Sequence, residues 1–151
     1  MTDTVSSTPV TELLNAIYKN VKMASDSLLN LMPKVKDEKL KNDMTVQLSV
    51  YEGFASRAAK LLAEEGGKPE EEGMMTKMGA KMGVMMNTMR DSTTSHLAEM
   101  IIEGSTMGMN DILKQIREAE QKDVSGEALR LARHLYEFEE KTAEDMKSYL
   151  R

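Results

Sequence analysis

The sequence predicts an all-α protein, a four-helix bundle whose two halves are joined by a helical crossover. Apolar residues recur at helical spacing over long stretches, and proline, glycine and helix-capping residues separate these stretches. The chain also has 15 methionines and few aromatic residues, a balance that suits the irregular gaps between packed helices. We therefore expect five helical segments, at about 9–32, 38–65, 70–90, 92–122 and 126–150.

Length and charge narrow the function classes. The chain has 151 residues, so we expect one helical-bundle domain over 9–151, preceded by a disordered arm over 1–8. The net charge is −5 with acids and bases interleaved, which argues against binding to nucleic acid or to an anionic membrane. Cysteine is absent, and the first residues resemble no secretory signal, so we expect a cytoplasmic protein.

The first two predicted helices have clear boundaries. Thr8 and Pro9 suit the N-cap and first position of the helix over 9–32, and Pro33 ends it. Asp37 is a suitable cap for the helix over 38–65, which ends at Gly66-Gly67. Each helix has one apolar face; the faces comprise Val10, Leu14, Ile17, Val21, Ala24, Leu28 and Leu31, and then Leu40, Met44, Leu48, Tyr51, Ala55, Ala58, Ala59 and Leu62.

The helix over 38–65 carries a second apolar stripe, roughly opposite the first. Its members are Val46, Val50, Phe54 and Leu61. A helix with two apolar faces has two surfaces to bury. This pattern predicts that another chain segment, a second copy of the protein or another partner covers the second stripe.

Asp91 to Thr94 divide the second half of the chain, because their side chains compete for backbone hydrogen bonds and cap helices well. Before the break, the helix over 70–90 carries a methionine stripe from Met75 to Met89. Thioethers are soft ligands for Cu(I), but at this spacing a packing face or a partner-binding face is the simpler interpretation.

After the break, small residues occupy the apolar face of the helix over 92–122. Gly104, Ser105 and Gly108 lie in the middle of this face, so we expect a neighbouring helix to approach most closely there. The last helix is predicted to start at an N-cap Ser125. Its inward residues are expected to be Ala128, Leu131, Ala132, Leu135, Phe138, Thr142, Met146 and Tyr149.

Two helix pairs joined by a bundle-length crossover are typical of ferritin-like bundles. The runs HLAEMIIEGSTMG and LARHLYEFEEKTAEDMKSYL resemble an uncharacterised group of small bacterial ferritin-like proteins, with similarity over about residues 10–150. The resemblance implies a ferritin-like up-down fold. Metal-binding members of that superfamily hold two iron or manganese ions with carboxylates and paired Glu-x-x-His motifs.

The Glu-x-x-His motif is absent, because Thr93 and Leu131 precede the two histidines, His96 and His134, by three residues. The reversed spacing occurs twice, as His96 with Glu99 and as His134 with Glu137. Both reversed pairs are predicted to point away from the core. Ion pairing on a solvated helix face explains them more simply than metal ligation.

Glu139 and Glu52 are the acids nearest the predicted core. Glu139 is flanked by Leu135, Thr142 and Met146, and Glu52 lies at the border of its apolar face. A buried carboxylate is costly unless it is paired or binds something. For Glu139 the alternatives are a metal ligand, a hydrogen-bond acceptor for Tyr18, Tyr51 or Thr142 inside the bundle, or a place at the margin of the bundle. A dinuclear site would be incomplete, because Glu99 and Glu103 are predicted to face outward.

The sequence therefore favours a non-enzymatic bundle that serves as a structural or interaction module, with no catalytic residue and no cofactor. It would associate as a homodimer or with a partner protein through the second stripe or the methionine stripe. The alternative is a di-metal carboxylate oxidoreductase or metal-storage protein with iron or manganese, which rests on the resemblance alone. A third interpretation is a small apolar ligand held between methionine-lined helices.

Overall fold

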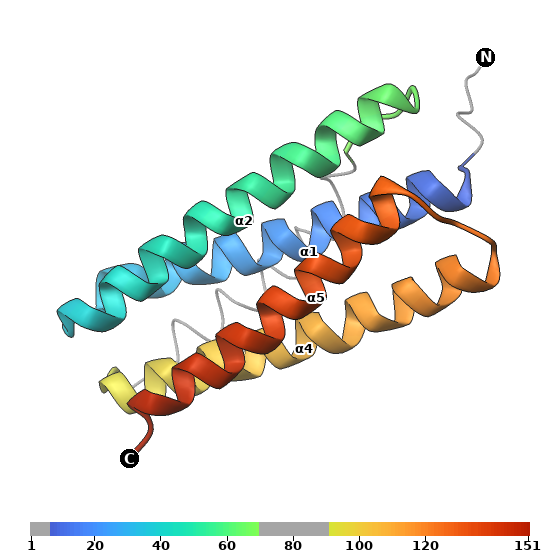
Figure 1. Cartoon of the computed structure of the whole chain (residues 1–151). Coiled ribbons are helices and arrows are strands. Elements are labelled where there is room, and N and C mark those ends of the chain that lie inside the picture. The colour runs from blue at the N-terminus through green and yellow to red at the C-terminus, as the bar shows by residue number, and fades with distance from the viewer. Residues whose placement is uncertain (1–6, 70–90) are drawn as a thin grey trace.

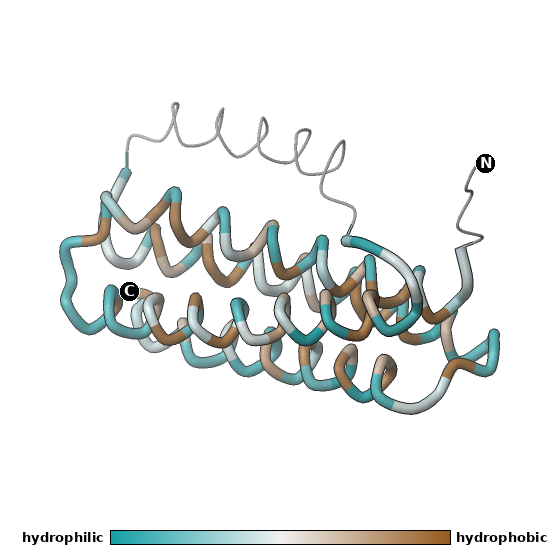
Figure 2. Tube along the Cα trace, turned by 90° about the horizontal axis from the view of Figure 1, so that it is seen from above, coloured by the Kyte–Doolittle hydropathy of each residue, from teal (hydrophilic) through white to brown (hydrophobic). Residues whose placement is uncertain are grey.

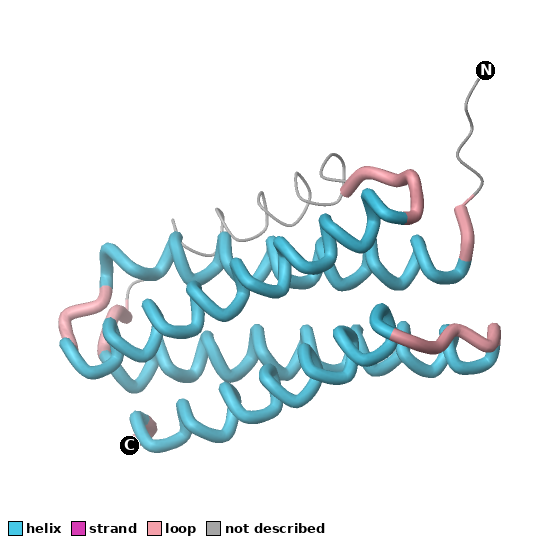
Figure 3. Tube along the Cα trace, turned by 45° about the horizontal axis from the view of Figure 1, so that its top comes forward, coloured by secondary structure: helices cyan, strands magenta, loops and turns pink. Residues whose placement is uncertain are grey.

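The computed structural model describes residues 7–69 and 91–151 (Figure 1). Four long helices make up most of this part of the chain: α1 (Pro9–Leu31), α2 (Glu38–Glu64), α4 (Thr94–Gln121) and α5 (Glu127–Met146). Two short 3₁₀ helices, η1 (Met32–Lys34) and η2 (Lys147–Tyr149), follow α1 and α5. Figure 3 shows that short loops complete the described segments, so the all-α prediction is confirmed.

The helices form two antiparallel pairs. α1 pairs with α2, α4 pairs with α5, and the two pairs meet where α1 packs against α4 and where α2 packs against α5. Figure 1 shows α2 and α4 running in the same direction, so α2 ends at one end of the bundle and α4 begins at the other.

Local sequence sets three of the four helix starts as predicted. Thr8 forms a capping box with Thr11, and Pro9 occupies the first turn of α1. The Asp37 side chain accepts a hydrogen bond from the backbone N–H of Leu40, and Thr93 accepts one from His96. The prediction that Ser125 caps the last helix was wrong. Gly126 occupies the N-cap with a φ of 83°, a left-handed conformation that favours glycine.

The predicted boundaries of these helices differ from the structure by two residues or fewer, except at the end of α5. The expected helix over 126–150 stops at Met146, and η2 continues the chain as a tighter turn. Residues 1–6 of the expected arm and the whole of the expected helix over 70–90 lie outside the described residues. The methionine stripe from Met75 to Met89 therefore lies outside them as well.

The core runs along the axis between the four helices. Figure 2 shows hydrophobic positions recurring along each helix between hydrophilic ones. The largest fully buried apolar side chains come from all four helices: Leu13, Leu14, Ile17, Val21, Leu40, Met44, Leu62, Leu97, Ile112, Leu135 and Met146. Most residues of the predicted apolar faces are buried, which is what their helical spacing indicated. None of the described helices has the length and hydropathy needed to span a bilayer.

The C-terminal residues contact the first turns of α2 and α4. The Tyr149 hydroxyl donates a hydrogen bond to the Asp43 carboxylate on α2. The ammonium group of Lys39 lies 4.7 Å from the centre of the Tyr149 ring. The backbone N–H of Arg151 donates to Ser95 Oγ at the start of α4. These contacts fix the end of α5 and η2 against both pairs.

The second stripe of α2 is partly covered within the chain. Phe54 packs against Phe138 of α5, with ring centroids 6.0 Å apart, and Leu61 packs against the core. Val46 stays exposed, with 62% of its surface accessible. The stripe therefore does not lie wholly opposite the buried face, and the predicted cover by another chain segment is confirmed for Phe54, which α5 contacts.

Candidate functional site

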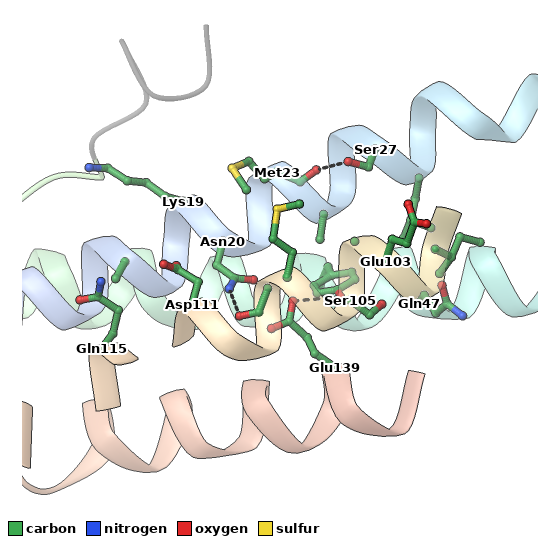
Figure 4. A pocket seen from close by; sticks show the side chains of 18 of the residues that line it. Lys19, Asn20, Met23, Ser27, Gln47, Glu103, Ser105, Asp111, Gln115 and Glu139 are labelled. Atoms are coloured by element: carbon green, nitrogen blue, oxygen red, sulfur yellow. Dashed lines mark hydrogen bonds between the residues drawn. The ribbon is translucent and has the colours of Figure 1, made fainter. Parts of the chain in front are cut away.

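A groove of about 760 Å³ opens between α1 and α4 in the middle of the bundle (Figure 4). Its walls come mainly from these two helices, and α2 and α5 contribute residues to its floor. The apolar wall residues include Met23, Ala24, Leu28, Met100, Ile101 and Met107. Polar side chains reach the floor from all four helices.

Two glycines of α4, Gly104 and Gly108, line the groove. Gly104 is exposed, and a Cβ added there would meet no atom within 4 Å. The predicted close helix approach at Gly104 was therefore wrong. The approach is close at Gly108, where the nearest atom to an added Cβ is the Oε2 of Glu139, at 2.5 Å. A side-chain carboxyl group, not a neighbouring helix backbone, fills the space that Gly108 leaves.

Glu139 is the buried acid of the groove floor, with 1% of its surface exposed. Tyr51 donates a hydrogen bond from its hydroxyl to Glu139 Oε2 over 3.3 Å. Burial raises the pKa of Glu139 to about 8, although the Tyr51 hydroxyl and the Asn20 amide act to lower it; the negative charge of Asp111 acts in the same direction as burial. At neutral pH the carboxyl group is therefore mostly protonated.

Tyr51 is held by a ring contact with Phe138 and by its hydroxyl hydrogen bond to Glu139. Its ring meets the Phe138 ring edge to face, with centroids 5.1 Å apart. Burial raises the pKa of the Tyr51 hydroxyl well above its usual value, and the adjacent Glu139 raises it further. Tyr51 is therefore a hydrogen-bond donor to Glu139 over the whole physiological pH range.

Two amide side chains complete the floor. Asn20 of α1 donates a hydrogen bond from Nδ2 to the backbone carbonyl of Gly108 over 2.9 Å. Gln47 of α2, one helical turn before Tyr51, donates from Nε2 to the Met146 sulfur over 3.8 Å. Both residues are nearly inaccessible, with exposed fractions of 5% and 6%.

Three acceptor atoms on this floor have no hydrogen-bond partner among the described residues. They are Asn20 Oδ1, Gln47 Oε1 and Glu139 Oε1. A buried polar atom without a partner costs about 1–3 kcal/mol, so native proteins keep few of them. Their presence in one groove indicates that a hydrogen-bond donor belongs there.

The acids that the sequence analysis singled out differ in their burial. The structure places Glu139 in the core, where it accepts a hydrogen bond from Tyr51, one of the three predicted donors. Glu52 is exposed, so its predicted position at the core border was wrong; α2 turns the side with Met44, Gln47 and Tyr51 inward. Glu99 and Glu103 are exposed, as predicted, and Glu103 lies on the rim of the groove.

The two histidines lie away from Glu139. His134 is exposed and His96 is half-buried near the start of α4, so the prediction that both pairs point outward holds for His134 and only in part for His96. In the described part of the chain no ion pair joins His96 to Glu99 or His134 to Glu137.

The floor does not fit a di-metal carboxylate centre. Such a centre takes acids from four helices and two histidines, whereas the described helices bring one buried carboxyl group and two neutral amides to this level. Within residues 7–69 and 91–151, no three His, Cys, Asp or Glu side chains come together in a group that could hold a metal ion. The donor set suits hydrogen bonding better than metal ligation.

Asn20 and Gln47 are the functional candidates that sequence reasoning missed. A signal for them existed: Asn20 follows the buried Ile17 by three positions, and Gln47 stands between Met44 and Tyr51 at helical spacing. A polar residue at the edge of an apolar stripe is more often exposed, so the pattern alone favoured solvent.

A second, smaller hollow of about 360 Å³ lies between α2 and α5. It is lined by Val50, Gly53, Phe54, Arg57, Arg130, Leu131 and His134. It includes two members of the stripe that predicted a dimer or partner surface, so that expectation stays a prediction.

No protein-family model matches the chain, and no curated protein and no solved structure is similar enough to it to show a relationship.

Proposed function

We propose that this protein is a small-molecule binding protein, which holds a mostly apolar ligand in the groove between α1 and α4. The observation that carries this proposal is a groove of about 760 Å³ with apolar walls and a polar floor. Binding sites for small molecules are typically 300–1,000 Å³ in volume, with mainly apolar linings and a few convergent polar groups. The proposal takes up the third interpretation of the sequence, in which the partner is a small apolar ligand held between helices.

Binding without chemistry is the simplest role for this groove. The described residues that line it include no histidine. Its buried acid, Glu139, is hydrogen-bonded to Tyr51, and its other acids are exposed on the rim. This arrangement supports the proposal that the protein is not an enzyme, because it offers a ligand hydrogen bonds but no activated nucleophile.

We further propose that the bundle has the ferritin-like topology. The pairing of α1 with α2 and of α4 with α5, together with the shared direction of α2 and α4, supports it.

The metal alternative has a direct test. We expect protein purified without a metal-affinity tag to contain no stoichiometric metal and to take up none on anaerobic titration with Fe(II) or Mn(II). Stoichiometric uptake that is lost in Glu139→Gln would overturn the proposal of a metal-free binding protein.

The binding proposal is tested with a neutral fluorescent probe, 1-naphthylmethanol, and the full chain. We expect saturable binding to one site. The readout is the change in naphthalene fluorescence when the probe moves from water into the apolar groove. Gly104→Leu is expected to weaken binding at least tenfold, because Gly104 lines the groove and the new side chain would occupy part of its open space.

Gly53→Leu is the matched control. Gly53 also lies within an exposed face of a long helix, also has no atom within 4 Å of an added Cβ, and does not line the α1/α4 groove. Its affinity for the probe should equal that of the wild type. Absence of saturable binding, or equal loss in the two variants, would show that the groove is not a ligand site.

A further inference from the structure

Two buried acceptors meet beside Gly108. Glu139 Oε1 lies 3.1 Å from the position that a Cβ of Gly108 would take, and Asn20 donates to the Gly108 carbonyl oxygen. Figure 4 shows Asn20 reaching from α1 toward the Glu139 carboxyl group. Side chains from α1 and α5 are thus brought together on the surface of α4.

The other polar atom of each side chain is already engaged. Asn20 uses Nδ2 to bond Gly108, and Glu139 uses Oε2 to accept from Tyr51. These bonds fix the orientation of both groups and leave Asn20 Oδ1 and Glu139 Oε1 without partners among the described residues. An amide oxygen accepts only, and so does a carboxylate oxygen once Glu139 has lost its proton. In that ionised state the floor can accept hydrogen bonds from a group that carries several donors.

The charges around the groove favour a cation. Among the described residues its lining has three exposed acids, Glu12, Glu103 and Asp111, besides the buried Glu139, and one base, Lys19. The apolar walls exclude a bare, strongly hydrated ion as the whole ligand, because they offer nothing in exchange for its hydration shell. A cationic head on an apolar body satisfies both the floor and the walls.

Resting on the proposed function of the groove, we infer that its ligand is an organic ammonium compound. Its N–H groups donate to Asn20 Oδ1 and Glu139 Oε1, and its apolar body lies along the methionines of α1 and α4. Gln47 Oε1 on α2 offers a further acceptor one helical turn from Tyr51. Hydrogen bonds between a charged donor and a carboxylate are about twice as strong as neutral ones, so the head group sets the selectivity.

Binding is coupled to the release of a proton. Without a cation beside it, Glu139 is mostly protonated at neutral pH, because burial raises its pKa to about 8. An adjacent ammonium group favours the carboxylate, so the carboxyl proton passes to solvent as the ligand enters. The groups that face Glu139 are the Tyr51 hydroxyl on α2, Asn20 on α1, and Asp111 on α4; Lys19 lines the same groove.

The test uses three probes of one shape on the full chain at pH 7: 1-naphthylmethylammonium, 1-naphthylmethanol and 1-naphthoate. We expect the ammonium to bind at least tenfold more tightly than the alcohol, and the naphthoate to bind most weakly. Equal or tighter binding of the alcohol would overturn the ammonium inference. The unpartnered oxygen atoms would then be hydrogen-bonded to ordered water, and the groove would still be a ligand site. Failure of all three probes would overturn the proposed function itself.

Glu139→Gln separates a charge effect from a packing effect. It should weaken ammonium binding at least tenfold more than it weakens 1-naphthylmethanol binding, and it should abolish the proton release that calorimetry measures in buffers of different ionisation enthalpy. Glu140→Gln is the control, because Glu140 is the exposed neighbour on the same helix. A Glu139→Gln protein that binds and releases protons as the wild type does would overturn the inference, and so would an equal loss in Glu140→Gln.

Discussion

Glu139 occupies the space that a side chain at Gly108 would fill. An added Cβ at Gly108 would lie 2.5 Å from Glu139 Oε2, well inside van der Waals contact. The residues are 31 positions apart in the chain and meet because α4 and α5 pack as an antiparallel pair. The absence of a side chain at Gly108 therefore makes room for a buried acid, and this gives the two glycines of α4 opposite roles.

Alanine substitutions at the two glycines should have opposite effects on stability. Gly104→Ala meets open space and gains helix propensity, so we expect the free energy of unfolding to rise by about 0.5–1 kcal/mol. Gly108→Ala must displace Glu139 from Tyr51, so we expect the free energy of unfolding to fall by about 1–3 kcal/mol. Urea denaturation of the wild type and the two variants at pH 7 measures both effects. Equal changes in the two variants would contradict the close contact between Gly108 and Glu139.

Glu139 should make the protein less stable as the pH rises. Between the usual carboxyl pKa of 4.5 and the folded-state value of about 8, the unfolded chain loses this proton and the folded chain keeps it. Because the unfolded state then binds fewer protons, the free energy of unfolding falls with pH, and the loss is complete above about pH 8.

The Glu139→Gln variant isolates this effect, since glutamine keeps the shape and does not titrate. We expect the wild type to lose about 4 kcal/mol relative to the variant between pH 5 and pH 8, at about 1.4 kcal/mol for each unit of pH. Denaturation at a series of pH values gives the difference between the two curves. A difference that does not change with pH would mean that Glu139 titrates alike in the folded and unfolded chains.

Removal of the Tyr51 hydroxyl should raise the pKa of Glu139. The hydrogen bond from Tyr51 favours the carboxylate, so Tyr51→Phe removes an interaction that lowers this pKa and leaves the Phe138 ring contact in place. We expect a Glu139 pKa above that of the wild type, measured by carbon NMR of the carboxyl group, and about 1 kcal/mol less stability. Tyr136→Phe, at a half-buried tyrosine of α5, should leave the Glu139 pKa unchanged.

The sequence by itself determined the helices and most of the core. Three helices begin at the capping residues Thr8, Asp37 and Thr93, each of which accepts a hydrogen bond from the residue three positions later. A contact over three positions depends on the local sequence alone, so the sequence predicts it. The inward face of each helix followed from helical spacing, and so did the burial of Glu139 among Leu135, Thr142 and Met146.

The tertiary structure alone decided what each inward residue contacts. Asn20 bonds to Gly108 across 88 positions, Gly104 borders a groove whereas Gly108 admits a carboxyl group, and Glu52 turns to solvent. Periodicity gives the angle of a residue around its own helix, but not the distance to the neighbouring helix or the side chain that stands opposite. Those depend on how four helices pack together, which no single stretch of the chain encodes.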